Sequence, residues 1–224
     1  MRIKKLFEYK EEILSRLKDK IDVNKALSDS HSRRFPRPCG ITIHVGIGCP
    51  YSCVYCYIKD MGFPMGRTRP YPLTGDELVY ALASNKFFIP SVNGTFVAFG
   101  SVTEPFAPKL VDRTIEYMQA ISKWFKNPIQ FSIKAKIDEE TINRLVKVRE
   151  DKRISPLITI ITIDWRRKLE PFAPPIEDRL TTMSLLREKG FNPVLFLRPI
   201  IPGITDREFE KILTKSMENG AIGV

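Results

Sequence analysis

Short apolar runs alternate with amphipathic stretches along most of the chain. From Ile41 onward, each run of strand length is followed by a stretch with apolar residues at helical spacing. Strands that alternate with helices in this way pair in parallel, with a crossover helix between neighbours. The pattern predicts an α/β barrel or a doubly wound sheet. The expected strands are 41–47, 95–100, 129–133, 157–163 and 193–200, and the expected helices are 76–86, 110–124, 139–148, 176–189 and 206–217.

The two ends of the chain differ from this repeat. Residues 1–22 carry apolar positions close to helical spacing and predict one or two helices. The segment 28–38 mixes polar residues with two prolines, so we expect an extended connector there. The final residues resemble the opening of a sixth strand; either the native chain continues past Val224 or another element covers the open sheet edge. We therefore expect a helical N-terminal extension over 1–37 and a barrel core over 38–224.

Composition narrows the class of protein. A chain of 224 residues with 43% hydrophobic content can bury one substantial core. There is no apolar run of about 18 residues and no apolar stretch of a signal peptide, so we expect a cytoplasmic protein without a membrane partner. The formal net charge of +10 suits an anionic partner such as nucleic acid, and it fits a solvated surface of mixed sign equally well.

Three of the four cysteines lie within eight residues, directly after the first expected strand. Cys49, Cys53 and Cys56 are too close together to form a disulfide framework, so metal ligation is the better use of them. Three thiolates can hold three irons of a four-iron cluster and leave the fourth iron open. Zinc is the alternative, with Cys39 or His44 as a fourth ligand. If no zinc binds, we expect Cys39 to be a small buried hydrophobe.

The cysteine spacing resembles that of the radical S-adenosylmethionine (SAM) superfamily. The family pattern CxxxCxΦC, with Φ aromatic, is matched by Cys49, Cys53, Tyr55 and Cys56. The resemblance implies an enzyme with a partial (β/α)6 TIM-type barrel. It also implies a [4Fe–4S] cluster on the three cysteines, with SAM bound at the open iron and cleaved reductively to a 5′-deoxyadenosyl radical. An electron donor such as ferredoxin or flavodoxin would supply the electron, and the substrate stays open.

Three further segments, 103–108, 169–174 with Arg179 downstream, and 198–206, resemble the spore photoproduct lyase-like (DNA-repair-photolyase-like) subgroup. The net charge of +10 favours a radical SAM enzyme that modifies nucleic acid or RNA as one alternative, and a zinc-dependent nucleic-acid-binding protein that uses Cys39 with the other three cysteines is another. The lyases place a catalytic cysteine near the end of the second strand, where this chain has residues 100–102, Gly-Ser-Val. The O–H bond of a serine hydroxyl is too strong for serine to donate a hydrogen atom to a carbon radical, so we do not expect repair of the spore photoproduct.

The resemblance also implies contacts to SAM. Tyr55 would meet the adenine, and Ser101, Thr103 or Glu104 would meet the amino group. Lys134 would reach the carboxylate, and Thr162 the ribose or carboxylate, although strand alternation also allows Thr159; Arg198 closes the fifth strand.

Structural roles compete with several of these contacts. Thr103 and Glu104 could instead cap the following helix, and Lys134 could be a surface lysine. Glu170 and Arg179 resemble a charged pair of the family, which would brace a loop or orient a substrate.

Overall fold

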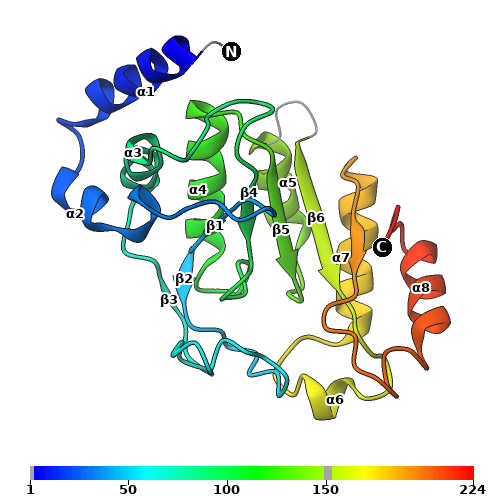
Figure 1. Ribbon diagram of the computed structural model, residues 1–224. Coiled ribbons are helices and arrows are strands. Elements are labelled where there is room, and N and C mark those ends of the chain that lie inside the picture. Colours follow the sequence, from blue (N-terminus) through cyan, green and yellow to red (C-terminus); the bar gives the residue numbers. More distant parts are fainter. Residues whose placement is uncertain (1–2, 149–152) are drawn as a thin grey trace.

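The computed structural model describes residues 3–148 and 153–224. In this part of the chain, five strands form one parallel sheet whose spatial order follows the chain order. Each strand is followed by a helix on the outer face, as right-handed crossovers require. The predicted partial barrel is thus confirmed, with five strands in place of six (Figure 1). The strands are β1 (Ile41–Ile43), β4 (Val97–Phe99), β5 (Ile129–Ile133), β6 (Ile154–Thr159) and β7 (Val194–Phe196); the helices are α3 (Gly75–Ser84), α4 (Val111–Trp124), α5 (Glu139–Val148), α7 (Ile176–Glu188) and α8 (Phe209–Glu218).

Side-chain alternation along the strands separates an apolar outer face from a more polar inner face. In β5, Ile129, Phe131 and Ile133 are buried against the helices, whereas Gln130 and Ser132 are only partly covered. β1 and β4 show the same alternation. Period-two alternation in a parallel strand indicates that one face is solvated, because strands covered on both faces are apolar throughout. The inner face of this sheet therefore lines an open lumen.

The last residues pair beside β7, as the apolar end of the sequence predicts. The amide of Ile222 donates to the carbonyl of Pro193 (2.9 Å), and the amide of Leu195 donates to the carbonyl of Gly223 (2.9 Å). These two bonds join the end of the chain to β7, although residues 221–224 form no regular strand.

The N-terminal extension packs on α3 and shares its core. Helix α1 (Ile3–Leu17) buries Ile13 and Leu17 in the same apolar cluster as the strands. Helix α2 (Val23–Ser28) and a 3-10 turn (Ser30–Ser32) follow, so the expected extended connector is wrong over its first residues.

The side chain of Asp29 explains that turn. It accepts hydrogen bonds from the amide and ring of His31 (2.9 and 2.6 Å) and from the hydroxyl of Tyr71 (2.6 Å). His31 in turn accepts the amide of His44 at its other ring nitrogen (3.2 Å). Both histidines thus serve to dock the extension on β1.

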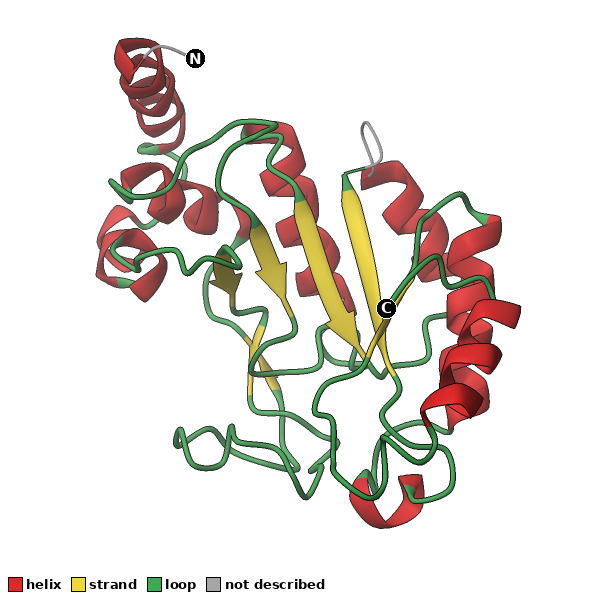
Figure 2. Cartoon of the chain, turned by 45° about the vertical axis from the view of Figure 1, so that its right-hand side comes forward, coloured by secondary structure: helices red, strands yellow, loops and turns green. Residues whose placement is uncertain are grey.

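The expected strand 41–47 is divided in two, since β1 ends at Ile43 and Gly46–Ile47 forms a separate strand, and two further small elements were not predicted. Strands β2 (Gly46–Ile47) and β3 (Arg69–Pro70) form an antiparallel ribbon around the cysteine loop, and α6 (Arg166–Leu169) follows β6. The ribbon and α6 both lie at the carboxyl edge of the parallel sheet, where the arrowheads point in Figure 2. No helix of the described residues is long and apolar enough to cross a membrane.

Candidate cofactor site at the carboxyl edge of the sheet

A cavity of about 420 Å³ lies over the inner face and carboxyl edge of the sheet. Its size is within the range of roughly 300–1,000 Å³ that is typical of small-molecule sites. Each of the five strands, or the segment that follows it, contributes to the lining. The lining residues include Cys49, Cys53, Tyr55 and Cys56 after β1; Ser101, Thr103 and Glu104 after β4; Ser132 and Lys134 at the end of β5; Thr159 of β6; and Phe196, Arg198 and Pro199 of β7 and its end.

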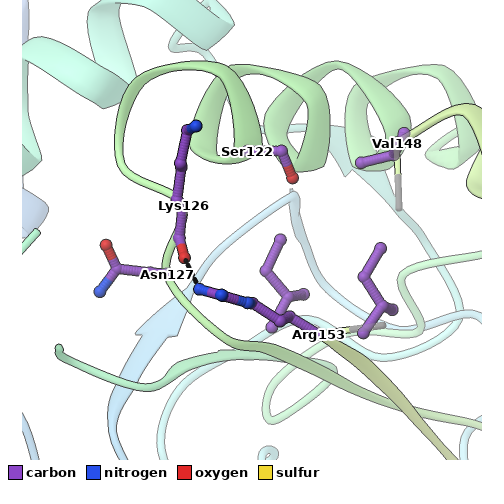
Figure 3. Close-up of a pocket in the computed structure, with 7 residues that line it drawn as sticks. Ser122, Lys126, Asn127, Val148 and Arg153 are labelled. Atoms are coloured by element: carbon purple, nitrogen blue, oxygen red, sulfur yellow. Dashed lines mark hydrogen bonds between the residues drawn. The ribbon is translucent and has the colours of Figure 1, made fainter. Parts of the chain in front are cut away.

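A second hollow lies at the opposite edge of the sheet (Figure 3). It measures only about 20 Å³ and is closed by the hydrogen bond from the Arg153 guanidinium to the Lys126 carbonyl (3.4 Å). A hollow of that size holds about one water molecule. The candidate site is therefore the large cavity.

Backbone hydrogen bonds shape the cysteine loop. The Cys49 amide donates to Pro64 (3.2 Å), the Gly66 amide donates to Cys49 (2.8 Å), and the Cys56 amide donates to Cys53 (3.0 Å). Gly48 has φ of 84°, and a Cβ there would stand 2.2 Å from the Arg67 carbonyl oxygen. The loop therefore needs glycine at this position to turn towards the cavity.

The cysteine side chains form one wall of the cavity. Cys49, Cys53 and Cys56 all line it, and they pack with Tyr51 and Tyr55. Burial raises the pKa of Cys49 to about 12 and also raises that of Cys53. Bound iron would reverse this, because a coordinating thiol is deprotonated by the metal.

The donor set is compatible with a cluster. Among the described residues, no three His, Cys, Asp or Glu side chains gather around one metal position. In a cubane cluster each cysteine binds a different iron, so the three sulfurs need not converge on one point. Three thiols on one wall of a cavity suit that arrangement.

Glu170 connects the cysteine loop to α7. Its carboxylate accepts the hydroxyl of Tyr55 and pairs with Arg179 (2.5 Å), while the Lys134 ammonium lies 3.8 Å away. Arg179 is fully buried and also donates to the carbonyls of Thr159 (3.0 Å) and Pro174 (3.0 and 3.2 Å). Because its guanidinium binds these protein groups, Arg179 stabilises the loop that contains Glu170.

The loop after β4 is fastened to its neighbours by two polar side chains. The hydroxyl of Thr103 donates to the Gly48 carbonyl, and the buried Glu104 carboxylate accepts the Lys134 amide (2.8 Å). Burial raises the pKa of Glu104 to about 7, despite the lowering effect of that amide. Helix α4 begins later, with Leu110 as its cap residue, so the capping role for these two side chains is wrong.

The predicted SAM contacts divide into two groups. Tyr55, Ser101, Thr103, Lys134 and Arg198 line the cavity, with Ser101 and Arg198 exposed at its mouth. The structure does not bring Thr162 to the lining.

Thr162 lies past the end of β6, which begins and ends earlier than predicted. Its hydroxyl donates to the Glu208 carboxylate (2.9 Å) and accepts the Trp165 amide (3.0 Å). Thr159, the alternative that strand alternation allowed, lines the cavity instead. Glu208 was not predicted, because it lies 46 residues from its partner.

The expectation of a buried Cys39 is wrong. Cys39 is exposed, and it also lines the cavity. It lies in a turn closed by hydrogen bonds between Arg37 and Gly40 (2.9 and 2.8 Å), ahead of β1 and outside the apolar core. His44, the other candidate zinc ligand, is buried and stacks on Phe63 and Tyr71.

Comparison with known families decides the class. The sequence model described as "Radical SAM superfamily" matches residues 43–215, which include the cysteine loop and all five strands except the first two residues of β1. The chain belongs to the radical SAM superfamily. Members of this superfamily use a [4Fe–4S] cluster and SAM, as the cysteine motif predicts.

Individual relatives agree with this assignment. The chain is 28% identical to an uncharacterized protein, MJ0683 of Methanocaldococcus jannaschii, over 77% of this chain and 65% of that protein. Among solved structures, it is similar to spore photoproduct lyase complexed with the dinucleoside spore photoproduct (TM-score 0.68, 13% identity, 93% of this chain and 69% of that one). A spore photoproduct lyase mutant gives TM-score 0.69 and 16% identity, with 86% of this chain and 56% of the other covered. At such identities the likeness shows the fold, and the chain spans about two thirds or less of most of these relatives.

Proposed function

We propose that this chain is the core of a radical SAM enzyme, with Cys49, Cys53 and Cys56 holding three irons of a [4Fe–4S] cluster. The observation that carries the proposal is that the cysteines form one wall of the cavity at the carboxyl edge of a partial barrel. α/β barrels place their chemistry at this edge. When bound, the cluster supplies the electron that cleaves SAM into methionine and a 5′-deoxyadenosyl radical.

The chain's own residues would orient SAM in the cavity. The Lys134 side chain is 16% exposed and suits the SAM carboxylate, since a cation there forms a charge-assisted hydrogen bond. Glu104, with Ser101 and Thr103 beside it, suits the amino group. Tyr55, whose hydroxyl is held by Glu170, would present its ring to the adenine. Thr159 is a better candidate than Thr162 for the ribose, and Arg198 would close the mouth.

The substrate class that we propose is nucleic acid, in DNA or RNA. Two observations support it: the formal charge of +10, and structural similarity to an enzyme solved with a dinucleoside photoproduct. Repair of that photoproduct is not part of the proposal, because residues 100–102 provide no thiol to return a hydrogen atom to the product. The electron donor would be a ferredoxin or a flavodoxin, and the proposed cellular location is the cytoplasm.

The experiment is an anaerobic SAM cleavage assay. Protein reconstituted with iron and sulfide and reduced with dithionite should release 5′-deoxyadenosine and methionine in equal amounts. The Cys53→Ala variant, which lacks one of the proposed cluster ligands, gives the background rate of 5′-deoxyadenosine release. Wild-type protein that holds iron but releases no more 5′-deoxyadenosine than this variant would contradict the proposal.

A further inference from the structure

The outer side of the cysteine loop is a thin, exposed part of the molecule. The Cys53 side chain is 8% exposed and lies among Tyr51 and Ala173, whereas the next residue, Val54, is 65% exposed. Consecutive residues therefore face opposite sides of the loop. One side faces the cavity, and the other faces solvent across a single layer of backbone.

Helix α6 lies directly beside this exposed side. The Val54 amide donates to the Leu169 carbonyl (3.0 Å), which joins the loop to the end of α6. Figure 1 shows both segments at the same end of the sheet, below the strands. Phe172, just after the helix, is 70% exposed, and Trp165, just before it, is 44% exposed. Exposed apolar side chains that flank one short helix are typical of a contact surface.

The charges beside these apolar side chains are positive. Arg167 and Lys168 are exposed, and the Lys168 ammonium lies 4.6 Å from the centre of the Trp165 ring. In the part of the chain that the structure describes, neither cation pairs with a carboxylate, because Asp164 is bound to Lys211 (2.6 Å) and Glu170 is buried. An acidic partner would therefore find two unpaired cations beside an apolar centre.

We propose that Val54, Trp165, Arg167, Lys168 and Phe172 form the electron-entry surface, which docks an acidic electron-transfer protein. This inference rests on the proposed function. SAM and the substrate would occupy the cavity side of the cysteines, so the donor has to approach from the outer side. It passes one electron to the cluster and is itself oxidised by one electron. Small apolar contacts with a charged rim are typical of such transient redox encounters, which bury little area and depend on salt.

Binding is the first readout, and it does not depend on turnover. A bacterial-type two-cluster ferredoxin in its oxidised form is titrated calorimetrically into the reconstituted protein at low salt. The double variant R167E/K168E should weaken binding by about tenfold or more, and added salt should weaken wild-type binding too. Phe172→Ser should weaken it without changing the salt dependence.

A matched control is available at the opposite end of the sheet. Lys86 is exposed and lies 4.9 Å from the centre of the Phe87 ring, so K86E reverses one charge beside an aromatic side chain, as K168E does beside Trp165, whereas the double variant reverses two charges. This variant should bind the ferredoxin as the wild type does. An equal loss with K86E and R167E/K168E, or no loss with R167E/K168E and Phe172→Ser, would overturn the proposal.

Comparing two electron sources then distinguishes a failure of this docking proposal from a failure of the proposed function. With reduced ferredoxin, R167E/K168E should form 5′-deoxyadenosine about tenfold more slowly, whereas with dithionite its rate should equal that of the wild type, because a small reductant needs no docking surface. Absence of the dithionite reaction in wild-type protein would refute the proposed function and leave the binding result standing. If R167E/K168E lost affinity for a single-stranded oligonucleotide but kept its affinity for ferredoxin, the surface would be a nucleic-acid platform, and the proposal would be overturned.

Discussion

Arg179 and Glu170 form an ion pair of 2.5 Å in which both side chains are completely buried. Their other partners include the Thr159 carbonyl of β6 and the Tyr55 hydroxyl of the cysteine loop. The pair therefore holds a cavity strand and the proposed cluster loop in fixed relation.

Arg179→Met should lower the free energy of unfolding by about 3–5 kcal/mol, because it leaves a buried carboxylate without its main partner. The double variant E170Q/R179M should lose less than the sum of the single variants, since no unpaired charge remains. Urea unfolding measures both. Lys136→Ala, which removes an exposed pair with Asp178 (2.8 Å), should change stability by less than about 1 kcal/mol. Equal effects of Arg179→Met and Lys136→Ala would contradict the bracing role.

Each of Cys49→Ala, Cys53→Ala and Cys56→Ala should abolish the reconstituted cluster, because each removes the ligand of a different iron. Cys39→Ala should retain it, since Cys39 lies in a turn outside the cysteine loop. Iron and labile sulfide analysis after gel filtration gives the result. Loss of metal in Cys39→Ala would indicate a four-cysteine site instead.

Much of the fold was predictable because its signals are local. Helix ends agree with the apolar spacing to within a few residues; α3, for example, begins after Thr74, whose hydroxyl accepts the Glu77 amide (3.2 Å). The ribbon of β2 and β3 has two residues in each strand, too short for a period of two to be detected. Helix α6, with four residues, is equally short.

The site residues that belong to the cysteine motif were predictable from the sequence. The three cysteines and Tyr55 follow from spacing, and all line the cavity. Thr162 was chosen over Thr159 because strand β6 was expected to extend to residue 163, whereas it ends at Thr159 and the chain turns away. The partner of Thr162, Glu208, comes from the last turn before α8, a contact that no local pattern reveals.

Lys134→Ala should weaken SAM binding by roughly tenfold or more without loss of iron, because it removes one charge-assisted hydrogen bond. Lys136→Ala is the matched control: Lys136 is 59% exposed and does not line the cavity. Thr162→Val should leave affinity unchanged and lower stability by about 1–3 kcal/mol, since it removes a buried hydrogen bond to Glu208. Equilibrium dialysis with labelled SAM measures the affinities. A Thr162→Val variant with normal stability and weakened SAM binding would instead support the contact between Thr162 and SAM that the sequence predicts.

Stability should fall as the pH is lowered from about 6.5 towards 4. Burial lowers the pKa of His44 to about 3 and also lowers that of His31. Below pH 6.5 both histidines therefore become protonated in the unfolded chain while they stay neutral in the folded chain, which favours unfolding. Each histidine contributes at most about 1.4 kcal/mol per pH unit, and the buried Glu104 carboxyl, whose pKa is raised to about 7, offsets one of them down to about pH 4.5 because it is protonated first in the folded chain. Asp29 adds a further loss only below about pH 4: burial raises its pKa, but the His31 and Tyr71 hydrogen bonds outweigh this and hold it at about 2.

His44→Phe provides the control for this dependence, because phenylalanine can keep the stacking on Tyr71 and cannot be protonated. Urea unfolding at pH 7.5, 6 and 5 should show a shallower decline for the variant than for the wild type. Identical slopes would show that His44 does not cause the acid sensitivity.

Electron paramagnetic resonance of the dithionite-reduced, reconstituted protein, recorded with and without SAM, tests the central claim most directly. Three cysteine ligands leave one iron open, so SAM should bind to it and change the g-values of the reduced cluster, while Cys39→Ala should show the same change. A cluster signal that SAM leaves unaltered, or colourless protein that binds one zinc ion, would contradict the account.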